Sequence, residues 1–209
     1  ANARLWYAYV NFWQHNNFEA AILAQYVAKT ANRSEGTIAL DAAYMAMAAF
    51  AQAYNDSKSP IEERSEEMRM VIRACNFITE RWPGSDKAND ARLMLGGLYS
   101  ASKRPTDAAE WYGKIPETDP KYPEAQVAAG QAYWTAYLGA GRLSGDAKPS
   151  VEKLNEWLNL SQTFLRKGIT RIAASLPKEG TAPAELIAAK MSLSQIVISL
   201  LWKSITLPT

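Results

Sequence analysis

The chain has 209 residues, with 23 Lys and Arg against 21 Asp and Glu, and it contains one His and one Cys. Its apolar share of 48% and aromatic share of 11% are enough to fill a core, which excludes a disordered chain, and the lone Cys75 excludes a disulfide scaffold. Only Cys75 and His15 could act as Cys or His ligands, which argues against a zinc site. The near-neutral net charge argues against electrostatic binding to nucleic acid or to an anionic membrane.

Apolar residues recur at spacings of three and four along almost the whole chain, which predicts helices. Prolines, glycines and polar turns divide this pattern into segments. We expect helices over 3–14, 17–31, 36–55, 60–81, 86–102, 105–114, 122–140, 149–175 and 183–205. Ser59-Pro60-Ile61-Glu62 has the residues of an N-terminal cap, which predicts that the fourth helix begins there. The expected fold class is therefore all-α.

The 35 alanines and the aromatics follow a repeating pattern in the middle of the chain. At an interval of 34 positions, the residues Ala91, Gly96 and Tyr99 recur as Ala125, Gly130 and Tyr133. The first of these stretches continues through Ala108 and Tyr112 to Pro120. Small residues at Gly96 and Ala108 predict that two helices cross closely there, with Tyr99 and Tyr112 filling the space beside the crossing.

This pattern resembles the tetratricopeptide repeat (TPR) family, whose unit is about 34 residues long. Residues 89–122 carry the family's residue types at Leu95, Gly96, Tyr99, Ala108, Tyr112 and Pro120, and they depart from them at Lys103, Pro105 and Ile115. The opening segment matches at Phe12, Phe18, Ala21 and Ala28, and it departs at Tyr9 and Arg33. Residues 36–83 fit only loosely, and the unit that begins at Tyr122 has a good first helix followed by an overlong second one.

The resemblance implies a right-handed α-α superhelix of about four helical hairpins. We expect units at about 2–35, 36–83, 84–121 and 122–180, an extra helix at 183–205, and a single domain over 1–209 that is a fragment of a longer protein. The stretch from Trp82-Pro83-Gly84-Ser85 to Tyr122-Pro123 is also similar to bacterial envelope proteins of the outer-membrane assembly lipoprotein and cell-division coordinator types. That similarity implies a periplasmic or cell-envelope location.

Residues that could carry chemistry are few, and each has a simpler interpretation. His15 lies in a predicted turn with no second ligand at a suitable spacing, and Cys75 lies on the apolar face of its helix, so we expect a polar turn residue and a buried thiol. Four carboxylates are interpreted as a solvated first helical turn facing Arg64 and Arg69, namely Glu62, Glu63, Glu66 and Glu67.

Two further motifs are also interpreted without chemistry. Gly139-x-Gly141-x-x-x-Gly145 follows a helix rather than a strand, so we interpret it as a flexible turn and not as a phosphate-binding loop. The Asn-x-Ser triplets at Asn32, Asn55 and Asn159 are interpreted as chance matches. We therefore expect a protein that is not an enzyme and that holds no cofactor or metal.

The first helix of each hairpin lines the concave groove in the TPR family. The resemblance places these positions at Trp6, Val10, Trp13 and Gln14 in the first unit, Tyr44 and Met47 in the second, Asp90, Leu93, Gly97, Ser100 and Ala101 in the third, and Glu124, Val127, Gln131, Trp134 and Thr135 in the fourth. Aromatic anchors in such a groove offer much contact area and few rotors to immobilise. The alternative is that Trp6, Trp13 and Trp134 pack between stacked units.

The last predicted helix is apolar on nearly every face from Ile196 to Ile205, which is unusual for a terminal helix in contact with water. Either further repeats cover it, or residues 183–205 bury against a partner or a second copy of the chain. Its longest apolar run, Ile196–Trp202, is shorter than the roughly 20 residues that cross a bilayer, so we expect no membrane span.

The function expected from these observations is a non-catalytic scaffold that binds a protein or peptide partner in its groove, and no nucleic acid. Two alternatives stay open. The chain could be a superhelical accessory region of a larger, cell-wall-cleaving envelope enzyme whose catalytic domain lies elsewhere, or it could be a structural module that self-associates.

Overall fold

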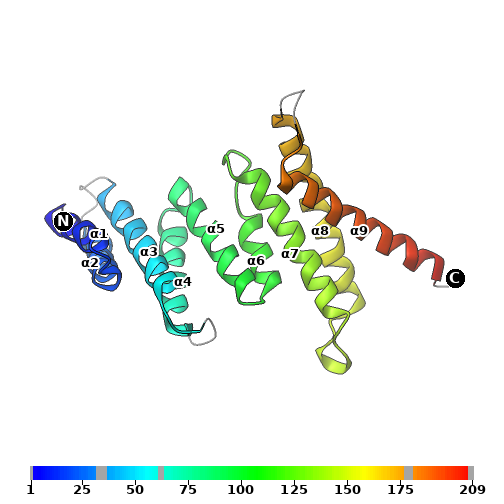
Figure 1. Cartoon of the computed structure of the whole chain (residues 1–209), viewed down its shortest axis with the longest axis horizontal. Coiled ribbons are helices and arrows are strands. Elements are labelled where there is room, and N and C mark those ends of the chain that lie inside the picture. Colours follow the sequence, from blue (N-terminus) through cyan, green and yellow to red (C-terminus); the bar gives the residue numbers. More distant parts are fainter. Residues whose placement is uncertain (1, 32–36, 61–63, 177–180, 207–209) are drawn as a thin grey trace. The chain divides into compact units, whose positions relative to one another are not determined.

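The computed structural model describes residues 2–31, 37–60, 64–176 and 181–206, apart from the side chains of Asp146 and of residues 202–206. All regular elements of these described residues are helical (Figure 1). The α-helices are α1 (Asn2–Trp13), α2 (Asn17–Thr30), α3 (Ile38–Asp56), α4 (Ser65–Arg81), α5 (Asp86–Ala101), α6 (Pro105–Gly113), α7 (Tyr122–Ala140), α8 (Val151–Ser175) and α9 (Ala184–Thr206), and the 3-10 turn η3 (Gly145–Ala147) precedes α8. The all-α prediction is confirmed.

The start of α4 differs from the sequence prediction. This helix begins at Ser65 rather than at Pro60, and the expected capping residues Ile61 and Glu62 lie outside the described residues. Arg64 stands before the first turn instead. Its guanidinium donates hydrogen bonds to the carbonyl oxygens of Ser59 (2.7 Å) and Tyr54 (3.1 Å). The Arg64 side chain therefore bonds one carbonyl group in the last turn of α3 and one in the connection to α4, which a capping motif read from local sequence does not predict.

The chain forms two compact units, unit 1 (Ala1–Leu95) and unit 2 (Gly96–Thr209), whose boundary falls within α5. In unit 1 each helix from α1 to α4 packs against the next along the chain. Its core combines alanines with a few larger side chains, which include Val27, Met47, Phe50, Val71 and Ile78. The single domain expected over 1–209 stays a prediction.

Small residues set the helix crossings of unit 2. A Cβ atom on Gly96 would lie 2.5 Å from the ring of Tyr112, so α5 and α6 approach each other there as predicted. A Cβ atom on Gly130 would lie 2.6 Å from Leu165 and 2.9 Å from the carbonyl oxygen of Ser161. The Ser161 hydroxyl donates a buried 2.7 Å hydrogen bond to the carbonyl oxygen of Gly130, which ties α8 to α7 at this crossing.

Helix α9 covers one side of α7 and α8 and leaves its other side open (Figure 1). Leu186, Ala189 and Ile196 are buried in the core of unit 2. Side chains on the opposite side are exposed, namely Ile187, Met191, Ile198 and Leu201. Residues 202–206, where the apolar pattern continues, have side chains outside the described set.

The same helix bears on the expectation that the chain has no membrane span. Within the described residues, the window Ala184–Leu201 is long and apolar enough to cross a membrane by length and composition alone, and 17% of it is buried. The expectation rests on the run Ile196–Trp202, which Ser199 interrupts, whereas this window extends through Ser192, Ser194 and Gln195. The absence of a span stays a prediction.

Candidate functional site

The two most exposed large hydrophobic side chains of unit 1 lie on one face of α1. Trp6 is 64% and Trp13 is 68% exposed, and Val10 between them is also exposed. Half-buried Tyr9 lies between the two indoles, with ring centroids 5.9 Å from Trp6 and 6.4 Å from Trp13. Because residues three, four and seven apart share a helix face, these four side chains form a continuous strip, which we name the α1 aromatic row (Trp6, Tyr9, Val10 and Trp13).

The α1 aromatic row ends at a small hollow. Trp13 borders a pocket of about 300 Å³ together with Phe12, His15, Asn17 and Gln52. Residues from α1, α2, α3 and the turn after α1 thus surround a space beside an exposed indole. This volume is at the lower end of the roughly 300–1,000 Å³ typical of ligand pockets. It is large enough for one side chain of a partner.

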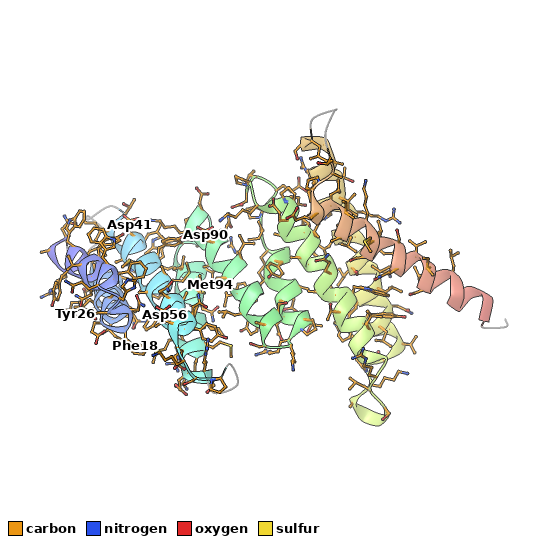
Figure 2. The ribbon with its side chains drawn as sticks, in the orientation of Figure 1. Phe18, Tyr26, Asp41, Asp56, Asp90 and Met94 are labelled. Carbon is orange, nitrogen blue, oxygen red and sulfur yellow. The ribbon has the colours of Figure 1, made fainter. Side chains whose placement is uncertain are left out.

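Two predicted groove residues of unit 1 contact each other. The hydroxyl of Tyr44 on α3 donates to a carboxylate oxygen of Asp90 on α5 at 3.0 Å. The Nζ atom of Lys87 lies 5.5 Å from the centroid of the Tyr44 ring and also pairs with Asp41. Figure 2 labels Asp41 and Asp90 on these two helices. The sequence mapping therefore brought together residues that form one polar cluster in the structure.

The electrostatics of Asp41 follow from this cluster. Partial burial by itself would raise the pKa of the carboxyl, but hydrogen bonds from Lys87 and Thr37 and the charge of Lys87 hold it below its ordinary value. Asp41 is therefore a charged anchor between α3 and α5. We assign this cluster to holding unit 1 together, because its charged groups are paired within the chain.

Three of the residues mapped to the groove have buried side chains, which corrects the expectation that they are open to a partner. Met47 is 2% exposed in the core of unit 1. Val127 and Trp134 belong to the core that α7, α8 and α9 enclose in unit 2, and the indole of Trp134 stacks on Tyr137 with ring centroids 5.4 Å apart. Position within a repeat indicates a helix face, but neighbouring helices can cover that face: α8 and α9 do so in unit 2, and Met47 lies on α3, which packs against α2 and α4.

The remaining mapped positions are accessible to different degrees. Gln14, Gly97, Ser100, Ala101, Glu124 and Thr135 are exposed, and Leu93 and Gln131 are half-buried. Ser100, Gln131 and Thr135 line a single pocket of about 970 Å³ in unit 2. We name it the unit 2 pocket; it is lined by residues 100, 103–107, 112, 128, 131, 132, 135, 136, 139, 140, 142, 143, 149 and 157.

Several residues of these sites were missed by sequence reasoning. Tyr9 counted only as a departure from the family's glycine, yet its ring joins the two indoles of the α1 aromatic row. Lys103 and Arg142 lie in connections between helices, where a mapping of first-helix positions assigns nothing. Lys103 carried one signal, since it departs from the family's glycine, and it has a left-handed backbone with φ of +58°.

The two residues most open to chemical interpretation have structural roles. His15 is exposed in the turn after α1, with φ of +62°, as expected for a polar turn residue. Cys75 is fully buried, and desolvation raises the pKa of its thiol to about 12, so it remains a neutral thiol. In the part of the chain that the structure describes, no three His, Cys, Asp or Glu side chains are grouped to hold a metal ion.

The other motifs of the sequence lie as follows. Gly139 is within α7, Gly141 follows its last residue, and Gly145 has φ of +61° in the connection to α8, so this stretch is a turn after a helix as expected. Glu66 is exposed and pairs with Arg69, whereas Glu62, Glu63 and Asn32 lie outside the described residues. Asn159 is on α8.

Comparison with known proteins supports the fold. No family model and no curated protein matches the chain. Two crystal structures of a putative kinesin light chain from Podosopora anserina, described as having nearly identical TPR-like repeats, are similar to it at 14% identity each. They align over 97% of this chain and over 88% and 87% of theirs, with TM-scores of 0.49 and, for a substituted form of that protein, 0.50.

At this identity the likeness is one of fold alone. Taken with the consecutive packing of helices and the close crossings at Gly96 and Gly130, it shows that the chain has a TPR-like helical-repeat fold. Folds of this class present extended surfaces built from successive helices, and they are generally scaffolds for protein interaction.

Proposed function

We propose that this chain is a non-catalytic scaffold that binds a peptide or protein surface, and that the α1 aromatic row is one of its contact sites. The observation that carries the proposal is the exposure of Trp6 and Trp13 on the same face of α1. Burying apolar surface is favourable by roughly 25 cal/mol per Å². A cluster of exposed aromatic side chains therefore indicates a surface that a partner covers.

The competing interpretation is that these tryptophans pack within the chain. This interpretation applies to Trp134, whose indole is buried among residues of α7, α8 and α9. It does not describe Trp6 or Trp13, whose ring contacts are with Tyr9 on their own helix. The hollow beside Trp13 adds a place where a partner's side chain would insert, and such a pocket beside an aromatic is typical of binding hot spots.

The experiment uses peptides selected from a random displayed library against the 209-residue chain. We then measure binding of the enriched peptide by fluorescence anisotropy to the wild type, Trp6→Ala and Trp13→Ala. We expect each substitution to weaken binding by about tenfold or more, because truncating an interface hot spot costs about 2 kcal/mol. The melting temperature stays close to that of the wild type, since both indoles are largely exposed.

Tyr26→Ala is the matched control. Tyr26 is also an exposed aromatic of unit 1, but it lies on α2, where Arg4 stacks on its ring, and it is not part of the α1 aromatic row. We expect this variant to bind the selected peptide like the wild type. Equal affinity for Trp6→Ala, Trp13→Ala and the wild type, or a large fall in their melting temperatures, would contradict the proposal.

A second candidate function is structural self-association through residues 183–205. It is favoured by the exposed apolar side chains on the outer side of α9, which include Ile187, Met191 and Ile198. The accessory role in a cell-wall-cleaving enzyme and the bacterial envelope location stay hypotheses. The sequence of the complete protein tests both, through a signal peptide or a catalytic domain.

A further inference from the structure

The unit 2 pocket is a cavity among helices α5 to α8 of unit 2. Its volume of about 970 Å³ is more than twice the 400 Å³ of the pocket beside His15 in unit 1. Its lining comes from the end of α5, the α5–α6 turn, α6, α7, the α7–α8 connection and α8. A cavity of this size lies near the upper end of the roughly 300–1,000 Å³ typical of ligand pockets.

Small residues on α7 form part of the pocket lining, which we name the floor of the pocket. Ala128, Ala132, Ala136 and Gly139 contribute to its lining, so a ligand can approach closely along this helix. The rings of Tyr112 from α6 and Trp157 from α8 also line the pocket. These rings pack beside the core formed by Ala108, Ala109, Ala132 and Tyr133 and are therefore held in place. The pocket thus offers fixed aromatic walls for an apolar side chain.

The charged residues of the pocket are predominantly basic. Lys103, Arg104 and Arg142 line it together with one acidic residue, Asp107. Arg104 is already engaged, since its Nε donates to Asp107 at 2.8 Å and its guanidinium lies 4.6 Å from the centroid of the Tyr99 ring. That leaves the charges of Lys103 and Arg142 unbalanced among the described side chains of the pocket. The pocket is therefore complementary to an anion.

The position of Lys103 is set by its turn. Its backbone N–H donates to the carbonyl oxygen of Ser100 at 3.1 Å, and that of Arg104 donates to Tyr99 at 2.9 Å. Lys103, with its left-handed backbone, follows the end of α5 and lines the pocket. Arg142 lines it from the connection after α7. Two separate helix connections thus each supply a cation.

Gln131 adds a polar group of another type. It lies on α7 among the small residues of the floor, and it is half-buried. A carboxamide carries both donors and an acceptor, the same combination that a peptide bond presents. It is therefore suited to hydrogen-bond the backbone of an extended chain that lies over α7.

We propose that the unit 2 pocket binds an extended acidic peptide segment. Carboxylates of the segment pair with Lys103 and Arg142, an apolar side chain packs against Trp157, and Gln131 bonds the peptide backbone. The inference rests on the proposed scaffold function in taking the occupant to be a peptide, but its site and its chemistry are independent of the α1 aromatic row.

The exposure of the two cations favours a peptide over a small free anion. Lys103 and Arg142 are exposed, and an ion pair at an exposed site contributes only about 0–1 kcal/mol. Two such pairs do not hold a free anion tightly. An acidic peptide adds the apolar and backbone contacts that the small-residue floor, the aromatic walls and Gln131 provide.

The test uses fluorescein-labelled synthetic peptides in which glutamate alternates with alanine and leucine. Matched peptides carry glutamine or lysine in place of every glutamate. We expect the acidic peptide alone to bind the 209-residue chain, and its affinity to fall as salt rises from about 0.05 M to 0.5 M, because ions screen exposed charges. The double variant Lys103→Gln/Arg142→Gln weakens binding by about tenfold, and Trp157→Leu weakens it separately.

The matched control is Arg166→Gln/Lys190→Gln, which removes one arginine and one lysine from exposed positions on α8 and α9 outside the pocket. Because its net charge equals that of the pocket variant, equal weakening in both would show nonspecific attraction and overturn the proposal. Equal binding of the acidic, neutral and basic peptides, or no binding of any, would also overturn it.

Citrate alone is titrated into the chain by calorimetry as a further arm. If citrate binds as tightly as the acidic peptide and displaces it, the pocket is a small-anion site and the peptide proposal fails. Each of these failures leaves the measurements on Trp6→Ala and Trp13→Ala unaffected, so failure of the acidic-peptide site is distinguishable from failure of the α1 aromatic row.

Discussion

Tryptophan shows how differently one residue type is used in this molecule. Trp6 and Trp13 are exposed on α1, whereas Trp134, at a corresponding repeat position on α7, is buried. The difference arises because Trp134 belongs to the core that α7 shares with α8 and α9 in unit 2, while the rings that contact Trp6 and Trp13 are on α1 itself. Whether an aromatic side chain is buried therefore depends on how far the neighbouring helices extend over that side chain, and its position on its own helix is not sufficient.

Asp41 and its partner Lys87 make unit 1 sensitive to acid. The pKa of Asp41 is lowered in the folded chain, so the stability it contributes is present above its unfolded pKa, near 3.8, and is lost as pH falls through the lower folded value. We expect Asp41→Asn to lower the free energy of urea unfolding at pH 7 by at most about 1 kcal/mol, because both partners are about one-third exposed. The difference between variant and wild type shrinks below about pH 4.

The control for this experiment is Glu66→Gln, which removes a carboxylate that pairs with Arg69 at a far more exposed site. We expect that variant to unfold like the wild type at both pH values. A deficit of the same size for Asp41→Asn at pH 7 and at pH 3 would show that the loss comes from packing or from the Thr37 hydrogen bond rather than from the charge.

At the scale of elements, unit 2 is organised by glycines at the crossings of α7 and α8. Gly130 lies against Leu165 and Ser161, and Gly168 of α8 lies against Val127 and the carbonyl oxygen of Pro123 on α7. The two helices therefore approach each other at two points along their length. The 34-residue periodicity included Gly130, but Gly168 occurs in an overlong helix that no repeat pattern describes.

We expect Gly130→Ala and Gly168→Ala each to destabilise unit 2 by about 1–3 kcal/mol, the usual cost of an added methyl group in a packed crossing. In each case the new Cβ atom would meet backbone atoms within 3 Å, which cannot rotate away. Thermal unfolding followed by circular dichroism measures the effect.

Gly139→Ala is the matched control, because Gly139 lies on the same helix with nothing within 4 Å of its Cβ position. It is expected to raise the melting temperature slightly, since alanine stabilises a helix by up to about 1 kcal/mol relative to glycine. If all three variants behaved alike, helix propensity rather than close packing would govern these positions.

At the scale of the whole molecule, the exposed apolar side of α9 bears on whether the chain associates with a second copy. Its outer side chains Ile187, Met191, Ile198 and Leu201 follow spacings of four, seven and three, which place them in one seam suited to another helix. If a second copy covers this seam, light scattering after size-exclusion chromatography gives a dimer mass that falls towards the monomer on dilution.

The variant Met191→Glu/Ile198→Glu places charges in the seam and is expected to be a monomer with an unchanged helix content. Arg166→Gln, at an exposed position on α8 away from the seam, serves as a surface control that should retain the dimer. A wild-type chain that remains a monomer at high concentration would exclude self-association through α9.

The sequence by itself determined the helices, the close crossing at Gly96 and the burial of Cys75, because these depend on periodicity, on residue size and on an apolar helix face. Of the nine α-helices in the described ranges, eight agree with their predicted ends to within two residues. The exception is the start of α4, where Arg64 bonds the carbonyl oxygens of Tyr54 in α3 and Ser59 in the connection, a contact that no local sequence pattern predicts.

Only the tertiary structure decided which of the mapped groove residues are accessible and where the cavities lie. Met47, Val127 and Trp134 are covered by neighbouring helices, and the unit 2 pocket combines small residues of α7 with Lys103 and Arg142 from two connections. The physical reason is that a helical period identifies which face of a helix is apolar, whereas exposure and cavities depend on the lengths and positions of the helices that pack against that face.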